Sequence, residues 1–302
     1  MRKYFTLISC IIIPPVTLVI NAPFGRFAPQ PNGPAKHTGI LQNFSFLAHP
    51  SLFINGRVSW VLMEIFAPTF FILTYLSSPL SPDRTDLSGF SLKTGLPPLL
   101  FLTHYLNRAL ISPLLLTPSR SNSHILVPLV GILFNVTNGS LLGSYLSSET
   151  TMSYLTRQKS SRAFWFGIGL WLLGFVGNVY HDEILFRIRR KAKSKGKFKQ
   201  ESGEHYAIPT GGLYTWISYP NYFCEWLEWL GFAIATAPLP FPISVTPLSS
   251  QPWFPTLTPP YIFLVNLVCL MLPRAYRGHQ WYILKFGNRY PRERKAAIPL
   301  VL

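Results

Sequence analysis

Residues 206–229 read YAIPTGGLYTWISYPNYFCEWLEW, and this stretch carries the most unusual chemistry of the chain. A polar loop with two glycines leads into an apolar helix that still carries Asn221, Glu225 and Glu228. In a helix these three residues and Trp229 lie at i, i+4, i+7 and i+8, so they share one face. A charged group at the bilayer centre costs roughly 2.5–3.5 kcal/mol when it faces lipid. We therefore expect this face to turn inward, the alternative being an ordinary amphipathic helix whose polar stripe faces water.

The composition favours a membrane protein. Of the 302 residues 48% are hydrophobic and only 13% are charged, and the mean hydropathy is +0.25. The net charge of +16 is compatible with nucleic-acid binding in principle, but the basic residues gather at the ends of apolar segments, as the positive-inside rule predicts. Cys10, Cys224 and Cys269 lie far apart in apolar runs, so we expect packing residues and no metal site.

Apolar runs that are long enough to cross a bilayer as helices predict seven transmembrane spans. The first run, residues 4–20, competes with a cleaved signal peptide, but Pro14 and Pro15 interrupt it and no small-residue cleavage site follows. We therefore favour a retained span. The other runs cover residues 57–78, 96–116, 123–146, 163–188, 222–242 and 255–273. The sequence thus predicts an all-α integral membrane protein with seven transmembrane helices.

The basic residues predict the orientation. Of 27 Lys and Arg residues, seven lie on the side of the N-terminus, 19 lie on the opposite side, and Arg108 lies within a span. Because cytosolic loops carry the excess of positive charge, we expect the C-terminus in the cytosol. The basic run at 187–199 then becomes a cytosolic loop, and the proline-rich piece at 238–260 becomes a short connection on the other side.

Polar side chains inside the predicted spans indicate a functional site, because such residues are costly at that depth. Two helical stripes stand out. One comprises Asn178, Asp182 and Arg189 and runs towards the cytosolic end of its span, and the other comprises Tyr105, Arg108 and Ser112. Such stripes can line one polar cavity open to the cytosol, where Arg and Asn suit the phosphates and amides of a nucleotide. The alternative is that they only form hydrogen bonds between helices.

Several motifs are specific enough to be recognised. In the C-terminal third these are NVYHDEILFRIR, YAIPTGGLYTW, SYPNYFCEWLEW and the ending YPRERKAAIPLVL. Thinner matches precede them: SWVLME ending at Glu64, THYLNR around Tyr105, and TNGSLLGSYL. Together they closely resemble the steroid 5α-reductase family of membrane-bound 3-oxo-steroid reductases. The resemblance covers most of the chain and implies a single reductase domain over 1–302, in which 1–150 supplies substrate-polarising residues and 151–302 most cofactor contacts.

This resemblance implies NADPH-dependent reduction of the Δ4 double bond of a 3-oxo-steroid in the endoplasmic reticulum membrane, with a lumenal N-terminus. By the motif positions, Glu64 and Tyr105 hold the 3-keto oxygen of the substrate. Hydride that reaches the β-carbon of the enone pushes charge onto this oxygen, and a donor aimed at it stabilises the enolate. The expected partners are a steroid or sterol-like lipid and membrane lipid, without nucleic acid, and the expected oligomeric state is a monomer.

The motif matches also imply the residues around the NADPH. The cofactor-binding candidates are Arg108, Arg120, Asn138, Asn178, Asp182, Arg189, Tyr206, Asn221, Arg274, His279 and Tyr282. Glu225 and Trp229 are expected to shape the pocket where nicotinamide meets steroid, and Arg294 is expected to be structural. The chain departs from the family pattern at AYRGHQWY, where only His279 of a His-rich run remains, and at Ser112, which replaces a tyrosine.

Three other functions compete with this interpretation. A trans-2-enoyl-CoA reductase of fatty-acid elongation reduces a conjugated carbonyl in the same fold, but Glu64 followed by Tyr105 in its motif favours the steroid enzyme. An isoprenylcysteine-type methyltransferase has an Arg-His-Pro motif, where this chain carries Ser218 and Tyr219 before the proline. A non-catalytic sterol-binding protein is the third alternative.

Overall fold

The computed structural model describes residues 49–81, 91–156, 161–194, 206–240 and 257–301. The first predicted span, residues 4–20, lies outside these ranges, as does most of the predicted proline-rich connection.

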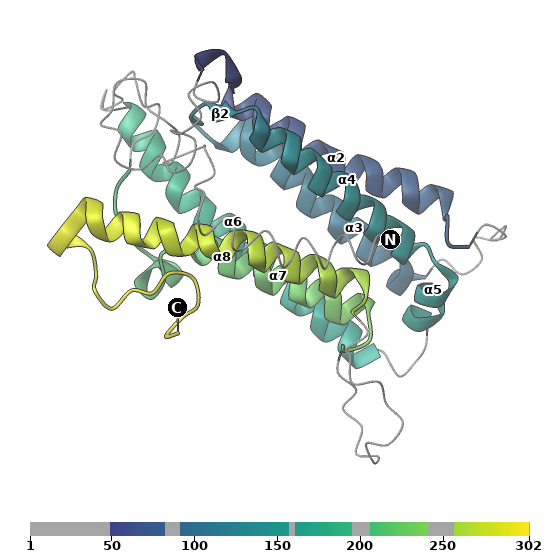
Figure 1. The fold of residues 1–302 in the computed structure, drawn as a ribbon. Coiled ribbons are helices and arrows are strands. Elements are labelled where there is room, and N and C mark those ends of the chain that lie inside the picture. Colours follow the sequence, from purple (N-terminus) through teal and green to yellow (C-terminus); the bar gives the residue numbers. More distant parts are fainter. Residues whose placement is uncertain (1–48, 82–90, 157–160, 195–205, 241–256, 302) are drawn as a thin grey trace.

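Helices dominate the described residues, as the apolar runs predict (Figure 1). The longer ones are α2 (Gly56–Ser77), α3 (Leu92–Tyr105), η5 (Leu106–Leu116), α4 (Leu126–Leu146), α5 (Glu149–Thr156), α6 (Ser161–Ser194), α7 (Pro220–Thr236) and α8 (Pro259–Phe286). The shorter elements are η4 (Pro50–Leu52), η7 (Gly212–Thr215), η8 (Gly287–Arg289) and the strands β1 (Phe53–Ile54) and β2 (Ser123–His124). The strands pair antiparallel, Phe53 with His124. This pair was not predicted, because two residues carry no readable alternation.

Within the described ranges, five helical segments are long and apolar enough to cross a membrane. They are Gly56–Ser77, Leu92–Leu116, Leu126–Leu146, Ser161–Ser194 and Pro259–Arg289. Helix α7 has 17 residues, fewer than the roughly 20 that cross a bilayer. It ends before Ala237, which is extended at φ −142° and ψ 150° because Pro238 follows and disfavours helical backbone. The predicted span at 222–242 was therefore too long.

Helix α6 is longer than predicted. The basic run was expected to be a loop from Arg187 onward, yet the helix continues to Ser194. Arg and Lys are good helix formers, and Lys191 and Lys193 in the last turn complement the negative end of the helix dipole. Glu183 adds to this, since it forms ion pairs with Arg187, at 2.8 Å, and with Arg190.

The long helices form two layers, with α2, α3 and α4 in one and α6, α7 and α8 in the other (Figure 1). A chain of aromatic rings joins the layers. Phe71 of α2 stacks on Phe101 of α3 with centroids 4.1 Å apart, and Phe101 lies 5.9 Å from Trp229 of α7. Trp229 in turn lies 4.6 Å from Phe263 of α8. This buried aromatic core fixes the polar face of α7 toward α3.

Glycines let α6 and α7 approach each other closely. A Cβ at Gly174 of α6 would come within 2.6 Å of the Cys224 carbonyl oxygen and the Glu228 Cα, both in α7. Gly167 and Gly231 face each other in the same way further along the pair. Small residues at such contacts are typical of helices packed in membranes.

We expect Gly174→Ala to lower the free energy of unfolding by about 1–3 kcal/mol, because an added methyl group overpacks this contact. Gly169→Ala is the matched control on the same helix, since a Cβ there meets no atom within 4 Å. Thermal unfolding of both variants in one detergent measures the difference. Equal unfolding midpoints would contradict the close approach of α6 and α7.

The second half of the predicted span at 96–116 is a π-helix, η5. Its ladder is visible at the end, where the Thr117 N–H donates to the Ser112 carbonyl oxygen five residues earlier at 2.9 Å. Arg57 of α2 caps this end through hydrogen bonds to the carbonyl oxygens of Thr117 and Pro118, at 2.7 and 2.9 Å. π-Helical turns are rare in proteins overall, and those that occur often lie at functional sites. The apolar run predicts α-helical spacing here, and this change of period was not predicted.

The C-terminal segment folds back onto the start of α7. Ser218 Oγ lies 2.7 Å from His279 Nδ1, 2.6 Å from the Tyr290 hydroxyl and 3.0 Å from the Lys295 carbonyl oxygen. Burial raises the pKa of the Tyr290 phenol, which keeps it protonated for this hydrogen bond. Arg294 is also buried here and donates to the Pro209 carbonyl oxygen at 3.3 Å, as expected of a structural residue.

Candidate functional site

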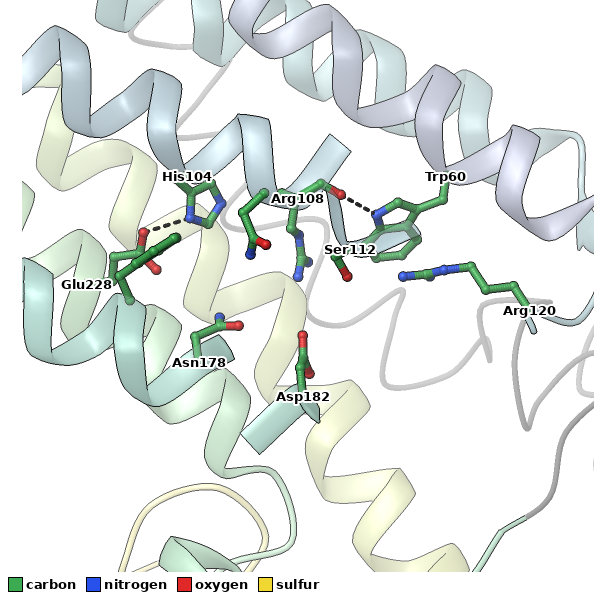
Figure 2. A pocket seen from close by; sticks show the side chains of 10 residues that line it. Trp60, His104, Arg108, Ser112, Arg120, Asn178, Asp182 and Glu228 are labelled. Carbon is green, nitrogen blue, oxygen red and sulfur yellow. Dashed lines mark hydrogen bonds and ion pairs between the residues drawn. The ribbon is translucent and has the colours of Figure 1, made fainter. Parts of the chain in front are cut away.

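A polar cavity lies between the two layers of helices (Figure 2). It is a small, partly open hollow, and its empty space of about 330 Å³ includes open solvent. Its lining residues are Trp60, His104, Asn107, Arg108, Ser112, Arg120, Phe175, Asn178, Asp182 and Glu228. They come from α2, α3, η5, α6, α7 and the segment after η5.

Arg108 is the centre of the charged network. Its Nε lies 3.5 Å from Glu64 Oε1 of α2, and its Nη1 lies 3.3 Å from Glu225 Oε2 of α7. Asn178 of α6 donates to the same Glu225 oxygen at 3.0 Å. The indole N–H of Trp60 donates to the Arg108 carbonyl oxygen at 3.1 Å. One arginine thus joins residues from α2, η5 and α7, which the separate motifs of the sequence did not place together.

His104 and Glu228 form a second polar contact in the cavity wall. His104 Nδ1 lies 2.7 Å from Glu228 Oε1, and the two residues are 5% and 0% exposed (Figure 2). The other carboxyl oxygen of Glu228, Oε2, is buried without a hydrogen-bond partner within the described part of the chain. Buried polar atoms are normally satisfied, so this oxygen is an acceptor left without a partner in a residue of the cavity wall.

The remaining polar wall is built by α6, α7 and Arg120. Asn221 Nδ2 donates to Asp182 Oδ1 at 2.9 Å, which ties α7 to α6. Arg189, further along α6, is within electrostatic range of Asp182. The Arg120 guanidinium lies over the Trp60 ring, 4.0 Å from its centroid. Of the stripe predicted on α6, Asn178 and Asp182 line the cavity, whereas Arg189 does not.

Glu64 and Tyr105 lie at the edge of this site. Both are buried, at 7% and 4% exposure, and neither lines the cavity itself. The Tyr105 ring packs against Phe101 at 4.7 Å and against Trp229 at 6.3 Å between centroids. Its phenol is within electrostatic range of the Glu64 carboxyl group. Among the described residues its hydroxyl makes no hydrogen bond, so it is free to donate to a ligand.

Other residues implied by the resemblance lie outside the cavity. Asn138 donates to the Phe134 carbonyl oxygen within its own helix at 2.8 Å. Arg274 Nε donates to the Tyr222 hydroxyl at 3.1 Å.

The cofactor-binding candidates with aromatic rings, His279, Tyr282 and Tyr206, also contact other residues of the protein. His279 holds Ser218 in the C-terminal segment. The Tyr282 ring stacks on Tyr290 at 5.5 Å, and the Tyr206 ring lies 5.0 Å from Trp281.

Trp60, Asn107 and Phe175 were not predicted as site residues, and no role was predicted for His104 or Glu228. A signal for His104 was present, because it lies four residues before Arg108 and shares its helical face. Glu228 was noticed on the polar face of α7, but without a partner it could not be given a role.

The donor set of the cavity fits a dinucleotide phosphate cofactor. Arg108 and Arg120 offer guanidinium groups, which bind phosphates well. Asn178 offers an amide, and the buried Glu228 Oε2 is an acceptor suited to a carboxamide N–H.

Comparisons with known proteins place the chain in a family. The family model described as 3-oxo-5-alpha-steroid 4-dehydrogenase matches residues 121–243 and 253–302. An uncharacterised protein of Schizosaccharomyces pombe is 36% identical over 301 residues, covering 95% of this chain and 94% of that protein. The 3-oxo-5-alpha-steroid 4-dehydrogenase 1 of Rattus norvegicus is 31% identical over 287 residues, covering 94% and 87%. The steroid 5-alpha-reductase DET2 of Solanum lycopersicum is 31% identical over 254 residues, covering 82% of each chain.

Proposed function

Because the chain belongs to the 3-oxo-5-alpha-steroid 4-dehydrogenase family, we propose that it reduces the Δ4 double bond of a 3-oxo-steroid to the 5α product with NADPH. The observation that carries this proposal is the family match over residues 121–243 and 253–302, which includes Asn178, Asp182, Asn221, Glu225 and Glu228. Rat and tomato relatives named for this activity match over most of the chain and support it.

Glu64 and Tyr105 are the proposed residues that polarise the substrate. Addition of hydride to the enone β-carbon moves charge to the carbonyl oxygen, where a positioned donor stabilises it. The buried Tyr105 hydroxyl, which has no hydrogen bond within the described residues, is the donor. Glu64, in its protonated form, donates the second hydrogen bond to the oxygen, and its carboxyl group lies 3.5 Å from Arg108.

NADPH, when bound, supplies the hydride. Arg108, Arg120, Asn178, Asp182 and Asn221 are the proposed binding residues in and beside the cavity. The remaining proposed residues extend this site along α4, α6, α8 and the loop before η7. They are Asn138, Arg189, Tyr206, Arg274, His279 and Tyr282. Glu225 and Trp229 separate the cofactor part of the site from the steroid part.

The proposal includes a location. We place the protein in the endoplasmic reticulum membrane as a monomer with seven spans, a lumenal N-terminus and a cytosolic C-terminus. Five membrane-length helices among the described residues support the membrane location. The excess of basic residues on the side of the C-terminus supports the orientation.

The test is an assay of membranes from a host without steroid 5α-reductase activity, with and without expression of this chain. With NADPH and testosterone or progesterone, we expect loss of the enone absorbance and a saturated 5α product, with far slower turnover when NADH replaces NADPH. Membranes of the untransformed host are the control. Reduction of a trans-2-enoyl-CoA but of no steroid would replace this proposal with the fatty-acid elongation enzyme.

A further inference from the structure

The contact between His104 and Glu228 has no role in the mechanism described so far, although it forms part of the cavity wall. His104 Nδ1 faces Glu228 Oε1 at 2.7 Å, which leaves the second ring nitrogen, Nε2, on the side away from Glu228 (Figure 2). The imidazole ring packs edge-on against Tyr105 and Trp229, with centroids 5.0 and 4.8 Å apart. Ring and carboxyl group are therefore held in one arrangement.

The charges around this pair favour storage of a proton. Four carboxyl groups lie in or beside the cavity, those of Glu64, Asp182, Glu225 and Glu228. Two guanidinium groups, those of Arg108 and Arg120, face them there.

Arg108 contacts Glu64 and Glu225, whereas the contact of Glu228 is the imidazole of His104. An uncompensated buried charge costs several kcal/mol, so the acidic excess is best relieved by a bound proton. With that proton the pair is an imidazolium hydrogen-bonded through Nδ1 to the Glu228 carboxylate, and its Nε2 carries a second N–H.

The proposed reaction requires one such proton. Hydride addition at the β-carbon forms one C–H bond, breaks the π bond and leaves the electron pair in an enolate. The enolate is complete as a ketone only after its α-carbon gains a proton, which forms the second C–H bond.

We propose that the pair of His104 and Glu228 supplies this proton. The inference rests on the proposed function. His104 donates from Nε2, the nitrogen on the side away from Glu228, and keeps its Nδ1–H on Glu228. The pair then regains a proton from water. Glu228 is a positioning residue in this scheme, because it sets the tautomer of His104 as a carboxylate does for a catalytic imidazole.

The variants Glu228→Gln and His104→Gln test this role. Each substitution replaces an ionisable group with a neutral amide of similar reach. Because general acid catalysis contributes about 10²–10⁴-fold, we expect kcat for enone reduction to fall at least about 100-fold in each variant. The KM for the steroid should change less than about threefold, and the double variant should be no worse than the single ones, because the two residues act as one unit.

Isotope effects separate proton donation from a merely structural role. If protonation becomes the slow step in the variants, the solvent deuterium isotope effect on kcat rises. The isotope effect of 4-deuterated NADPH on kcat then shrinks. A distorted but proton-competent site would slow hydride transfer and leave the cofactor isotope effect undiminished. Glu149→Gln, an exposed position of α5 away from the cavity, is the matched control and should keep wild-type values.

An infrared measurement on the ligand-free protein tests for the stored proton without turnover. It requires only the wild type and the folded Glu228→Gln variant. The wild-type spectrum minus that of Glu228→Gln should contain the band of a protonated carboxyl or an imidazolium group. If the wild type reduces the steroid but both variants keep kcat within twofold, or if the difference shows only carboxylate and neutral imidazole, the inference is overturned. If the wild type reduces no steroid, the proposed function fails instead.

Discussion

Replacing Tyr105 with phenylalanine should lower the rate of steroid reduction by about 10²–10³-fold, since removing one donor to a developing oxyanion typically costs this much. The ring would stay in the aromatic core beside Phe101 and Trp229, so the fold should be preserved. The loss should appear in kcat and in kcat/KM alike, because the hydrogen bond is strongest when charge develops. Steady-state kinetics with a fixed steroid and saturating NADPH measure it.

The companion variant Glu64→Gln keeps the shape of the side chain at the same oxygen and should lower the rate by a similar factor. Tyr180→Phe, at a tyrosine that is 52% exposed on α6, is the control for loss of a phenol and should behave as the wild type. Turnover that persists unchanged in both Tyr105→Phe and Glu64→Gln would exclude the proposed polarisation of the 3-keto oxygen.

Replacing Arg108 with methionine should destabilise the protein by about 3–5 kcal/mol, the usual cost of leaving one partner of a buried ion pair alone. Here one guanidinium compensates two carboxyl groups, at 3.5 and 3.3 Å, whose side chains are only 9% and 4% exposed. The measurement is denaturant or thermal unfolding of the purified variant in detergent.

A second substitution tests the cause. Glu225→Gln in the Arg108→Met background removes one uncompensated charge and should recover part of the lost stability, with a coupling of about 0.5–3 kcal/mol between the two positions. Additive effects of the two substitutions would show that Arg108 acts through packing on Trp60 rather than through charge. Activity should not return in the double variant, because Arg108 is also a proposed phosphate ligand.

The helices of this protein were largely predictable, while their relative placement was not. Apolar runs indicate α2, α4 and α8 because membrane helices need about 20 apolar residues. The same runs cannot show that Arg108 meets Glu64 and Glu225, since periodicity within one helix says nothing about its neighbours.

The errors at helix ends have local causes. The predicted span at 222–242 extends beyond Thr236 because the apolar run continues past Pro238. Proline disfavours helical backbone at the preceding residue, Ala237, so the helix ends there. The end of α6 was predicted too early because the basic run from Arg187 was interpreted as a loop. The ion pair of Glu183 with Arg187 stabilises the helix there. The proposed roles of the site residues came from the family resemblance, and His104 was overlooked because it adjoins the more conspicuous Tyr105.

The π-helix of η5 makes the chain sensitive to length at one place. Its ends are fixed, with Trp60 bound to the Arg108 carbonyl oxygen and Arg57 bound beyond the other end. Deleting a single residue between them would let the wide coil tighten into an ordinary α-helix, in which each residue accounts for about 100° of rotation. The residues between the deletion and Thr117 would then turn relative to Arg108 and to the cavity, so one lost codon in this stretch would do more harm than most substitutions there.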